Sequence, residues 1–246
     1  MKTKNKSVIK IENVSRIFYV GDSEVYALRD LNIEVHKGEF VSIMGPSGSG
    51  KSTAVNMVGC LDLPTKGKIY LDGKNIANLE ESDLAQIRGK KIGFIFQKFN
   101  LISTLTALEN VALPMLFQGI SVEERQKKAK KLLELVDLGD RIYHKPTELS
   151  GGQQQRVAIA RSLANNPQVI LADEPTGNLD SKTGIKILEF LDDLHKKGKT
   201  IIMVTHDPDL AKYADRVLYL KDGAIVENRK IKNNIKQKEL IKRRLK

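Results

Sequence analysis

Apolar and polar residues alternate along the chain in a way that predicts two kinds of β-strand. Short runs rich in β-branched and aromatic residues occur at residues 7–14, 39–45, 66–73, 91–97, 168–175, 199–207 and 216–223. The runs at 39–45, 168–175 and 199–207 are continuously apolar, as expected of strands that a parallel sheet buries on both faces. Those at 7–14 and 66–73 alternate, which is typical of antiparallel strands with one solvated face. We therefore predict an α/β core with an added antiparallel β layer.

A helical pattern replaces the strand pattern between Gln97 and Pro167, with predicted helices in 105–118, 121–138 and 150–167. In the second of these, Ser121 and Glu124 form a predicted capping box. An apolar stripe at helical spacing follows and is interpreted as core: Ala129, Leu132, Leu133 and Val136. The pattern indicates that a helical subdomain, at about residues 98–166, interrupts the α/β core.

The formal net charge of +11 is concentrated at the two ends of the 246-residue chain. Residues 228–246 contain nine basic residues and one acid, and the first ten residues contain four lysines. The part between them is left with a formal charge of about −1. A nearly neutral body is not typical of a DNA-binding domain.

A single cysteine, Cys60, rules out an intramolecular disulfide and favours a reducing compartment. We interpret it as a packed thiol. No apolar run approaches the ~20 residues that span a bilayer, and no signal-peptide pattern follows the lysine-rich start. The expected location is therefore cytoplasmic.

Residues 45–52 read GPSGSGKS and fit the phosphate-binding pattern G-x-x-x-x-G-K-[ST] between a predicted strand and a predicted helix. Tight turns at glycines let backbone N–H groups point at phosphate oxygens, and the helix N-terminus adds positive potential. Lys51 would reach the β- and γ-phosphates, and the Ser52 hydroxyl would bind Mg²⁺. The alternative is a glycine-rich turn that happens to contain lysine. Predicted ATP-binding residues here are Gly45, Pro46, Ser47, Gly48, Ser49, Gly50, Lys51, Ser52 and Thr53.

Two carboxylates, Asp173 and Glu174, end the apolar run VILADEP. This places them at the carboxyl edge of the sheet, where open α/β folds bind ligands. We expect Asp173 to hold magnesium and Glu174 to orient and polarise the water that attacks the γ-phosphate. Alone, such a pair is usually a solvated turn, and its significance depends on the phosphate loop upstream.

Two further polar residues follow predicted strands and should emerge at the same edge. His206 ends the run at 199–207 and is a candidate catalytic residue, with a structural histidine as the alternative. The amide of Gln97 could bind magnesium or the attacking water, and this residue marks the entry to the helical subdomain.

A second candidate anion site lies in LSGGQQQR, where Ser150, Gly151 and Gly152 offer backbone N–H groups at the start of a predicted helix. If both cradles cannot reach one nucleotide within a subunit, two copies arranged head to tail would place each cradle opposite the other's phosphate loop. The expected assembly is a two-fold dimer with two shared ATP sites.

The order of GPSGSGKST, Gln97, LSGGQQQR, VILADEP, GNLD and His206 resembles that of the ATP-binding cassette family, over nearly all of Val8 to Glu227. The resemblance implies a P-loop NTPase (RecA-like) α/β core, an antiparallel β subdomain and an inserted helical subdomain within residues 1–227. It also implies that ATP closes a homodimer and that hydrolysis reopens it. Tyr19 resembles the residue that stacks on adenine, with Val25 nearby, although a core tyrosine is the alternative. Gln153 joins Ser150, Gly151 and Gly152 in nucleotide binding, and Asp180 resembles the residue that links the two sites.

Segments such as GCLDLPTKGKIYLDG are similar to cassettes of the macrolide-export and lipoprotein-release type. This implies an ATPase at the cytoplasmic face of the membrane, bound to a permease that exports a substrate or extracts it from the membrane. An importer subunit is an alternative. A soluble cassette acting on ribosomes or nucleic acid is another, but such proteins generally fuse two cassettes or insert coiled coils. No nucleic-acid partner is expected, and substrate and permease stay undetermined.

The basic tail, residues 228–246, departs from a minimal cassette. If it is helical, Ile231, Ile235, Ile241 and Leu245 share one side, with Leu240 opposite. Such a segment could contact anionic lipid, the permease or nucleic acid, and a solvated tail is the alternative.

Overall fold

The computed structural model describes residues 7–231, and its centre is a six-stranded sheet in the order β10-β9-β3-β8-β7-β6. β3 (Phe40–Met44), β6 (Ile92–Ile95), β7 (Val169–Asp173), β8 (Thr200–Thr205) and β9 (Arg216–Lys221) pair in parallel, and β10 (Ala224–Lys230) is antiparallel to β9. The predicted parallel core is confirmed. Apolar residues alternate between its two faces: Ile170 and Ala172 pack into one buried cluster, and Val169 and Leu171 into the other. This two-sided burial is why the strands read as continuous apolar runs.

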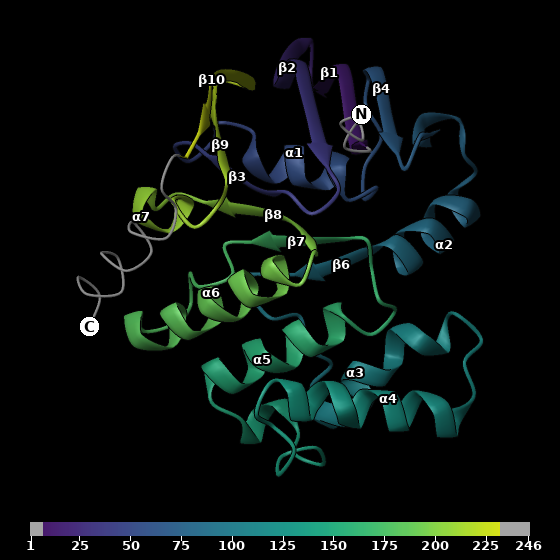
Figure 1. The fold of residues 1–246 in the computed structure, drawn as a ribbon. Helices are drawn as coiled ribbons and strands as arrows, with labels where there is room; N and C mark the ends of the chain where they lie inside the picture. Colours follow the sequence, from purple (N-terminus) through teal and green to yellow (C-terminus); the bar gives the residue numbers. More distant parts are fainter. Residues whose placement is uncertain (1–6, 232–246) are drawn as a thin grey trace, which may run out of the picture.

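The added β layer is a four-stranded antiparallel sheet in the order β2-β1-β4-β5, also as predicted. Its strands are β1 (Ser7–Val20), β2 (Ser23–His36), β4 (Lys66–Leu71) and the short β5 (Lys74–Asn75). α1 (Lys51–Val58) lies between this layer and the central sheet (Figure 1) and contributes Ala54, Val55, Met57 and Val58 to the cluster that joins them.

Helices cover the other face of the central sheet (Figure 1). α6 (Ser181–Lys196) and α5 (Gly151–Ser162) pack on it, and α3 (Ala107–Leu116) and α4 (Val122–Leu135) lie beyond α5. α3, α4 and α5 form the helical insertion, and their apolar residues share one buried cluster with the sheet. The predicted stripe is buried at Ala129, Leu133 and Val136. α2 (Glu81–Lys91) precedes β6, and α7 (Pro208–Ala211) and the 3₁₀ turns Ile76–Asn78 and Pro146–Glu148 complete the elements.

Several elements were not predicted from the sequence, among them α6 and α7, and the reasons are clearest at β2, α2 and β10. In β2 the alternation of Leu31, Ile33 and Val35 is interrupted at Asp30, which has a left-handed φ of 42° next to register shifts against β1. In α2 only Leu84 is buried, so the helix has no apolar stripe to detect. β10 continues three residues beyond Glu227, so residues 228–230 belong to the sheet and not to a separate tail. The rest of the predicted tail, residues 232–246, lies outside the described residues.

Candidate functional site

The loop between β3 and α1 needs glycine at two positions because backbone atoms approach it closely. A Cβ atom on Gly45 would lie 2.1 Å from the carbonyl oxygen of Leu220. Gly50, the N-cap of α1, has a φ of 98°, and a Cβ atom there would lie 2.4 Å from the carbonyl oxygen of Ala27. These contacts hold the loop against β9 and β2, so that its N–H groups gather at the start of α1.

Lys51 supplies the positive charge of this loop from a buried position. Its Nζ atom donates hydrogen bonds to the carbonyl oxygens of Gly45 (2.8 Å) and Pro46 (2.7 Å). An ammonium has three donors, so the same group can hold the loop and still reach a phosphate oxygen. The first turn of α1 contains no acidic residue, and its positive potential is not neutralised locally.

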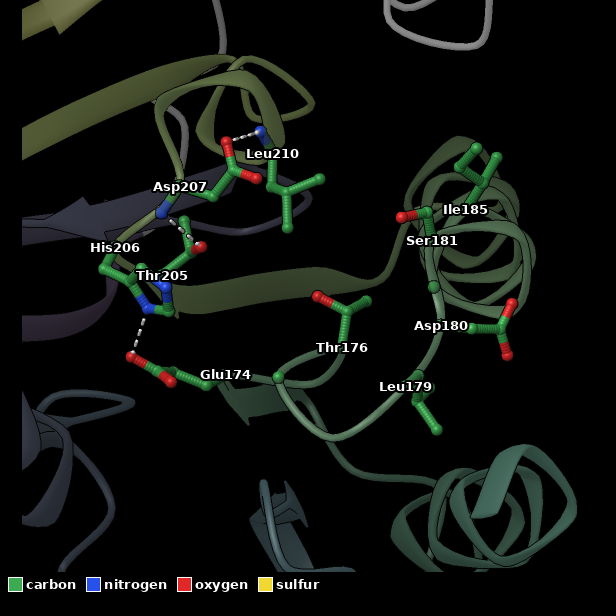
Figure 2. Close-up of a pocket in the computed structure, with 12 residues that line it drawn as sticks. Glu174, Thr176, Leu179, Asp180, Ser181, Ile185, Thr205, His206, Asp207 and Leu210 are labelled. Carbon is green, nitrogen blue, oxygen red and sulfur yellow. Dashed lines mark hydrogen bonds and ion pairs between the residues drawn. The ribbon is translucent and has the colours of Figure 1, made fainter. Parts of the chain in front are cut away.

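Glu174 and His206 meet across neighbouring strands. Glu174 follows β7, adopts a left-handed φ of 44°, and donates its backbone N–H to the carbonyl oxygen of Val204 in β8. This turn directs the carboxylate toward His206, which follows β8, and Oε1 lies 2.9 Å from Nδ1 of His206 (Figure 2). Because an ionised carboxylate only accepts, Nδ1 carries the hydrogen of this bond. The pair therefore fixes the direction of the Glu174 carboxylate.

The pKa of the Asp173 carboxyl is raised, first by its burial at the end of β7 and then by the negative charge of Glu174. The Lys51 ammonium opposes this shift and lowers the pKa, without cancelling it. An ionised Asp173 therefore lacks compensating positive charge from the protein itself, which is the setting in which a bound cation is favoured.

One cleft of about 540 Å³ brings most of the predicted residues together. The phosphate loop, the β7 and β8 ends, Gln97 and the start of β2 all contribute. The predicted residues that line it are Val25, Ser47, Gly48, Gly50, Lys51, Ser52, Thr53, Gln97, Asp173, Glu174 and His206. Tyr26, Ala27 and Val204 line it too and were not predicted, although Tyr26 and Ala27 directly follow the predicted Val25 and Val204 lies within the predicted run at 199–207. Tyr19 is 67% exposed at the end of β1, outside the lining of the cleft.

Hard oxygen donors suited to Mg²⁺ line this cleft: the Ser52 hydroxyl, the Gln97 amide and the Asp173 carboxylate. Across residues 7–231, no group of three or more His, Cys, Asp and Glu side chains is placed to hold a metal alone. Mg²⁺ is usually held by one or two protein oxygens together with substrate phosphates and water. The residues present fit that mode.

The LSGGQ residues lie elsewhere, at the start of α5, and none of Ser150, Gly151, Gly152 or Gln153 lines the cleft. Ser150 is the N-cap, its hydroxyl accepts from the N–H of Gln153 (3.3 Å), and Oε1 of Gln153 accepts from the N–H of Ser150 (2.8 Å). This capping box fixes the start of α5, and the predicted role of these residues in nucleotide binding stays a prediction.

Asp180 is the N-cap of α6 and lines a second cavity of about 200 Å³, which Glu174 and His206 also border (Figure 2). Its side chain accepts from the N–H of Thr183 (3.0 Å), and this hydrogen bonding lowers the pKa of the Asp180 carboxyl. The Glu174–His206 pair thus separates the Asp180 segment from the main cleft.

Comparison with known proteins gives consistent results. The family model described as ABC transporter matches residues 28–177. An uncharacterized ABC transporter ATP-binding protein of Methanocaldococcus jannaschii is 53% identical over 230 residues, 92% of this chain and 98% of that protein. The macrolide export ATP-binding/permease protein MacB of Aggregatibacter actinomycetemcomitans is 48% identical over 241 residues, 97% of this chain but 37% of that protein.

A solved structure of the same archaeal cassette superposes on this fold with a TM-score of 0.85 at 51% identity, covering 92% of this chain and 99% of that one. It is described as a dimer in a post-hydrolysis state bound to ADP and Pi. In the described part of the present chain, no helix combines the length and the apolar character that a membrane span requires.

Proposed function

The chain is an ATPase subunit that belongs to the ABC transporter family, and we propose that it drives export of a substrate through a membrane permease. The fold is the predicted P-loop NTPase fold of that family. The observation that carries the proposal is the convergence of Lys51, Asp173, Glu174 and His206 on one cleft beside the phosphate loop.

Hydrolysis of ATP in this cleft requires bound phosphates and an aligned water molecule. The backbone N–H groups of residues 47–53 and the Lys51 ammonium bind the β- and γ-phosphates. Glu174 accepts a hydrogen bond from the water, and the 2.9 Å contact with His206 holds its carboxylate in that direction. The water oxygen bonds to the γ-phosphorus while the bond to the ADP oxygen breaks, and Glu174 accepts the proton that the water loses.

Mg²⁺ would be held by Ser52, Asp173 and Gln97, and it would neutralise charge that develops on the phosphates. Asp173 must be ionised for this. Its raised pKa shows that the protein alone does not compensate its charge, which favours a bound cation. Gln97 lines the same cleft as the phosphate loop residues and would sense whether the cation and phosphate are present.

A head-to-tail homodimer in the ATP-bound state completes the site. Ser150, Gly151, Gly152 and Gln153 do not line their own cleft, whereas the helix start they form is suited to phosphate. The structure of the archaeal relative is a dimer with ADP and Pi bound, and this supports the same arrangement here. Asp180 and its cavity lie beside the shared site, and we assign it the contact between the two halves.

A permease is the partner that the exposed apolar surface favours. A groove of about 630 Å³ lies between α2, β6, α3 and α5 and is lined by Leu61, Phe94, Phe96 and Phe117 among others. The Phe117 side chain is 76% exposed. Of the described residues, none that lines the groove is acidic. Phe96 and Asn100 flank Gln97, so a permease segment in this groove would contact the loop that enters the nucleotide site.

Export is proposed over import because of the likeness to the macrolide export ATP-binding/permease protein. Extraction of a substrate from the membrane is the related possibility that uses the same machinery. An importer subunit would share every residue above, and reconstitution with the co-purified permease would separate the two by the side on which substrate accumulates. The location proposed is peripheral, at the cytoplasmic face. Contact of residues 228–246 with anionic lipid stays a prediction.

The test of the proposed function is Glu174→Gln, which keeps shape and removes the base. We expect ATP binding to persist, phosphate release to fall by about a thousandfold or more, and a dimer to accumulate with ATP in size-exclusion chromatography with light scattering. Glu123→Gln, in the exposed first turn of α4, is the matched control and should behave as the wild type. A Glu174→Gln protein that stays monomeric with saturating ATP would exclude the shared-site dimer.

A further inference from the structure

Arg161, near the end of α5, places a cationic side chain where no acid compensates it. Its Nη2 atom donates to the carbonyl oxygen of Phe99 (2.7 Å) and its Nη1 atom to that of Asn100 (2.5 Å). Within residues 7–231, no carboxylate lies within ion-pair distance of it. Burial of the guanidinium lowers the pKa of Arg161, which shows that the position disfavours the charge. Burial of a guanidinium is unfavourable unless hydrogen bonds compensate for its lost hydration, and here two backbone carbonyl oxygens of one loop do so.

That loop is held in an unusual backbone conformation. Phe99 and Asn100 have φ values of 47° and 50°, so two successive residues other than glycine are left-handed. This turns their carbonyl oxygens toward α5, where the planar fork of Arg161 binds both. Asparagine adopts this conformation readily, whereas a bulky aromatic residue such as Phe99 seldom does so without contacts that hold it. The guanidinium therefore stabilises the path of the chain directly after Gln97.

The same loop also touches the other end of α5. A Cβ atom on Gly151 would lie 3.8 Å from Cζ of Phe99, so the Phe99 ring reaches the LSGGQ residues while its carbonyl binds Arg161. On the opposite side, Nδ2 of Asn178 donates to the carbonyl oxygen of Gln97 (2.7 Å). The loop that carries Gln97 is thus fixed along the length of α5 and to the segment that follows Glu174.

We propose that Arg161 is a positioning residue that makes the Gln97 loop and α5 move as one unit. Gln97 faces the nucleotide of its own chain, and the start of α5 faces the nucleotide of the second copy. Through Arg161, a movement of Gln97 at one nucleotide also moves the LSGGQ residues at the nucleotide of the second copy. Arg161 itself contacts neither nucleotide. This inference rests on the proposed head-to-tail dimer.

The experiment compares Arg161→Lys with Arg125→Lys, both in the Glu174→Gln protein. Lysine keeps the charge but cannot bind two carbonyl oxygens as a planar fork. Arg125, which lies in α4, donates to the carbonyl oxygen of Ile120 (3.2 Å) and does not contact the Gln97 loop. It is therefore the matched control. For Arg161→Lys we expect ATP affinity of the monomer within about twofold and an ATP-dependent dimer dissociation constant raised about tenfold. Amide exchange in residues 97–100 should accelerate, and Arg125→Lys should change none of these.

A structural role alone would lower thermal stability and leave the ratio of dimerisation to ATP binding unchanged, which would overturn the proposal. If Arg161→Lys folds poorly, Arg161→Ala is measured with added guanidinium at millimolar concentration. Recovery of dimerisation by guanidinium, and not by an equal concentration of ammonium, supports the proposal, and recovery by neither overturns it. Failure of Glu174→Gln itself to dimerise refutes the proposed function instead, so the two failures are distinguishable.

Discussion

The phosphate loop and the LSGGQ segment are built alike but are completed differently. Each contains glycines and ends at the start of a helix, α1 in one case and α5 in the other. The first lies in a cleft with Lys51, Asp173, Glu174 and His206 from its own chain. The LSGGQ segment does not line this cleft and so is not beside these four side chains. Two segments of similar local sequence therefore differ in their surroundings. The phosphate loop has its catalytic side chains in the same chain, whereas the LSGGQ segment does not.

The caps of the two helices show the physical reason. α1 begins at Gly50, which has no side chain to bind the exposed N–H groups, and Lys51 adds a positive charge. α5 begins with a capping box in which Ser150 and Gln153 satisfy each other's N–H groups. The first cradle attracts phosphate by itself, whereas the second offers fewer donors and no cation. We expect it to act only on a nucleotide that another chain already holds.

The largest effect is expected from Lys51→Ala, which breaks the first region. The change removes the loop's charge and its hydrogen bonds to Gly45 and Pro46, so ATP affinity and turnover should both fall, kcat/KM by about a thousandfold. Isothermal titration calorimetry with ATP measures the affinity, and a phosphate-release assay measures the turnover. Lys66→Ala, on the exposed part of β4, is the control. Unaltered ATP affinity in Lys51→Ala would remove the phosphate-loop assignment.

A smaller, more selective effect is expected from Gly151→Asp, which breaks the second region. The added Cβ atom has room, because its nearest neighbours would be Leu179 Cδ2 at 3.7 Å and Phe99 Cζ at 3.8 Å. The fold and ATP binding should therefore persist, while the new negative charge opposes phosphate and lowers turnover about a hundredfold. Circular dichroism, nucleotide titration and phosphate release test these three statements.

Mixing the two variants sharpens the comparison. A heterodimer of Lys51→Ala with Gly151→Asp, both in the Glu174→Gln protein, contains one site in which the phosphate loop and the LSGGQ segment are both intact. ATP-dependent association should therefore return on mixing, although neither variant alone associates. Light scattering of the mixture measures this, and absence of association in the mixture would contradict a site shared between chains.

The smallest effect concerns stability. Because the pKa of Asp173 is higher in the folded protein than in the unfolded chain, its ionised form disfavours folding, and stability falls as pH rises through the folded pKa. Asp173→Asn should therefore raise the free energy of unfolding at pH 7 by about 1 kcal/mol while abolishing turnover. The gain should vanish as the pH falls below the ordinary pKa of aspartate, because the wild-type carboxyl is then protonated in both the folded and the unfolded protein.

Urea denaturation of the nucleotide-free protein over this pH range measures the gain. Asp180→Asn is the matched control, because hydrogen bonds from Thr183 lower the pKa of Asp180 and the substitution should bring no gain. An Asp173→Asn protein that is less stable than the wild type at pH 7 would contradict the inference that the ionised Asp173 carboxylate disfavours folding.

Prediction from sequence succeeded where a pattern depends on burial and failed where local geometry interrupts it. The runs at 39–45, 168–175 and 199–207 are β3, β7 and β8 because two-sided burial leaves a continuous apolar signature. β2 was missed because a left-handed residue, Asp30, breaks its alternation. Tyr26 and Ala27 also line the cleft beside the predicted Val25, and no motif in the sequence distinguishes them.

The order of the residues specifies which chemical groups are present and where each one follows its strand or helix. Glycines, lysine and carboxylates in these spacings act through local backbone geometry, which neighbouring residues specify. Which of these groups come into contact depends on the packing of distant elements. The contact of Glu174 with His206 depends on β7 and β8 being adjacent and in register, and the exclusion of Gly151 from the cleft depends on how α5 packs. Long-range packing decides these distances, and no short motif carries that information.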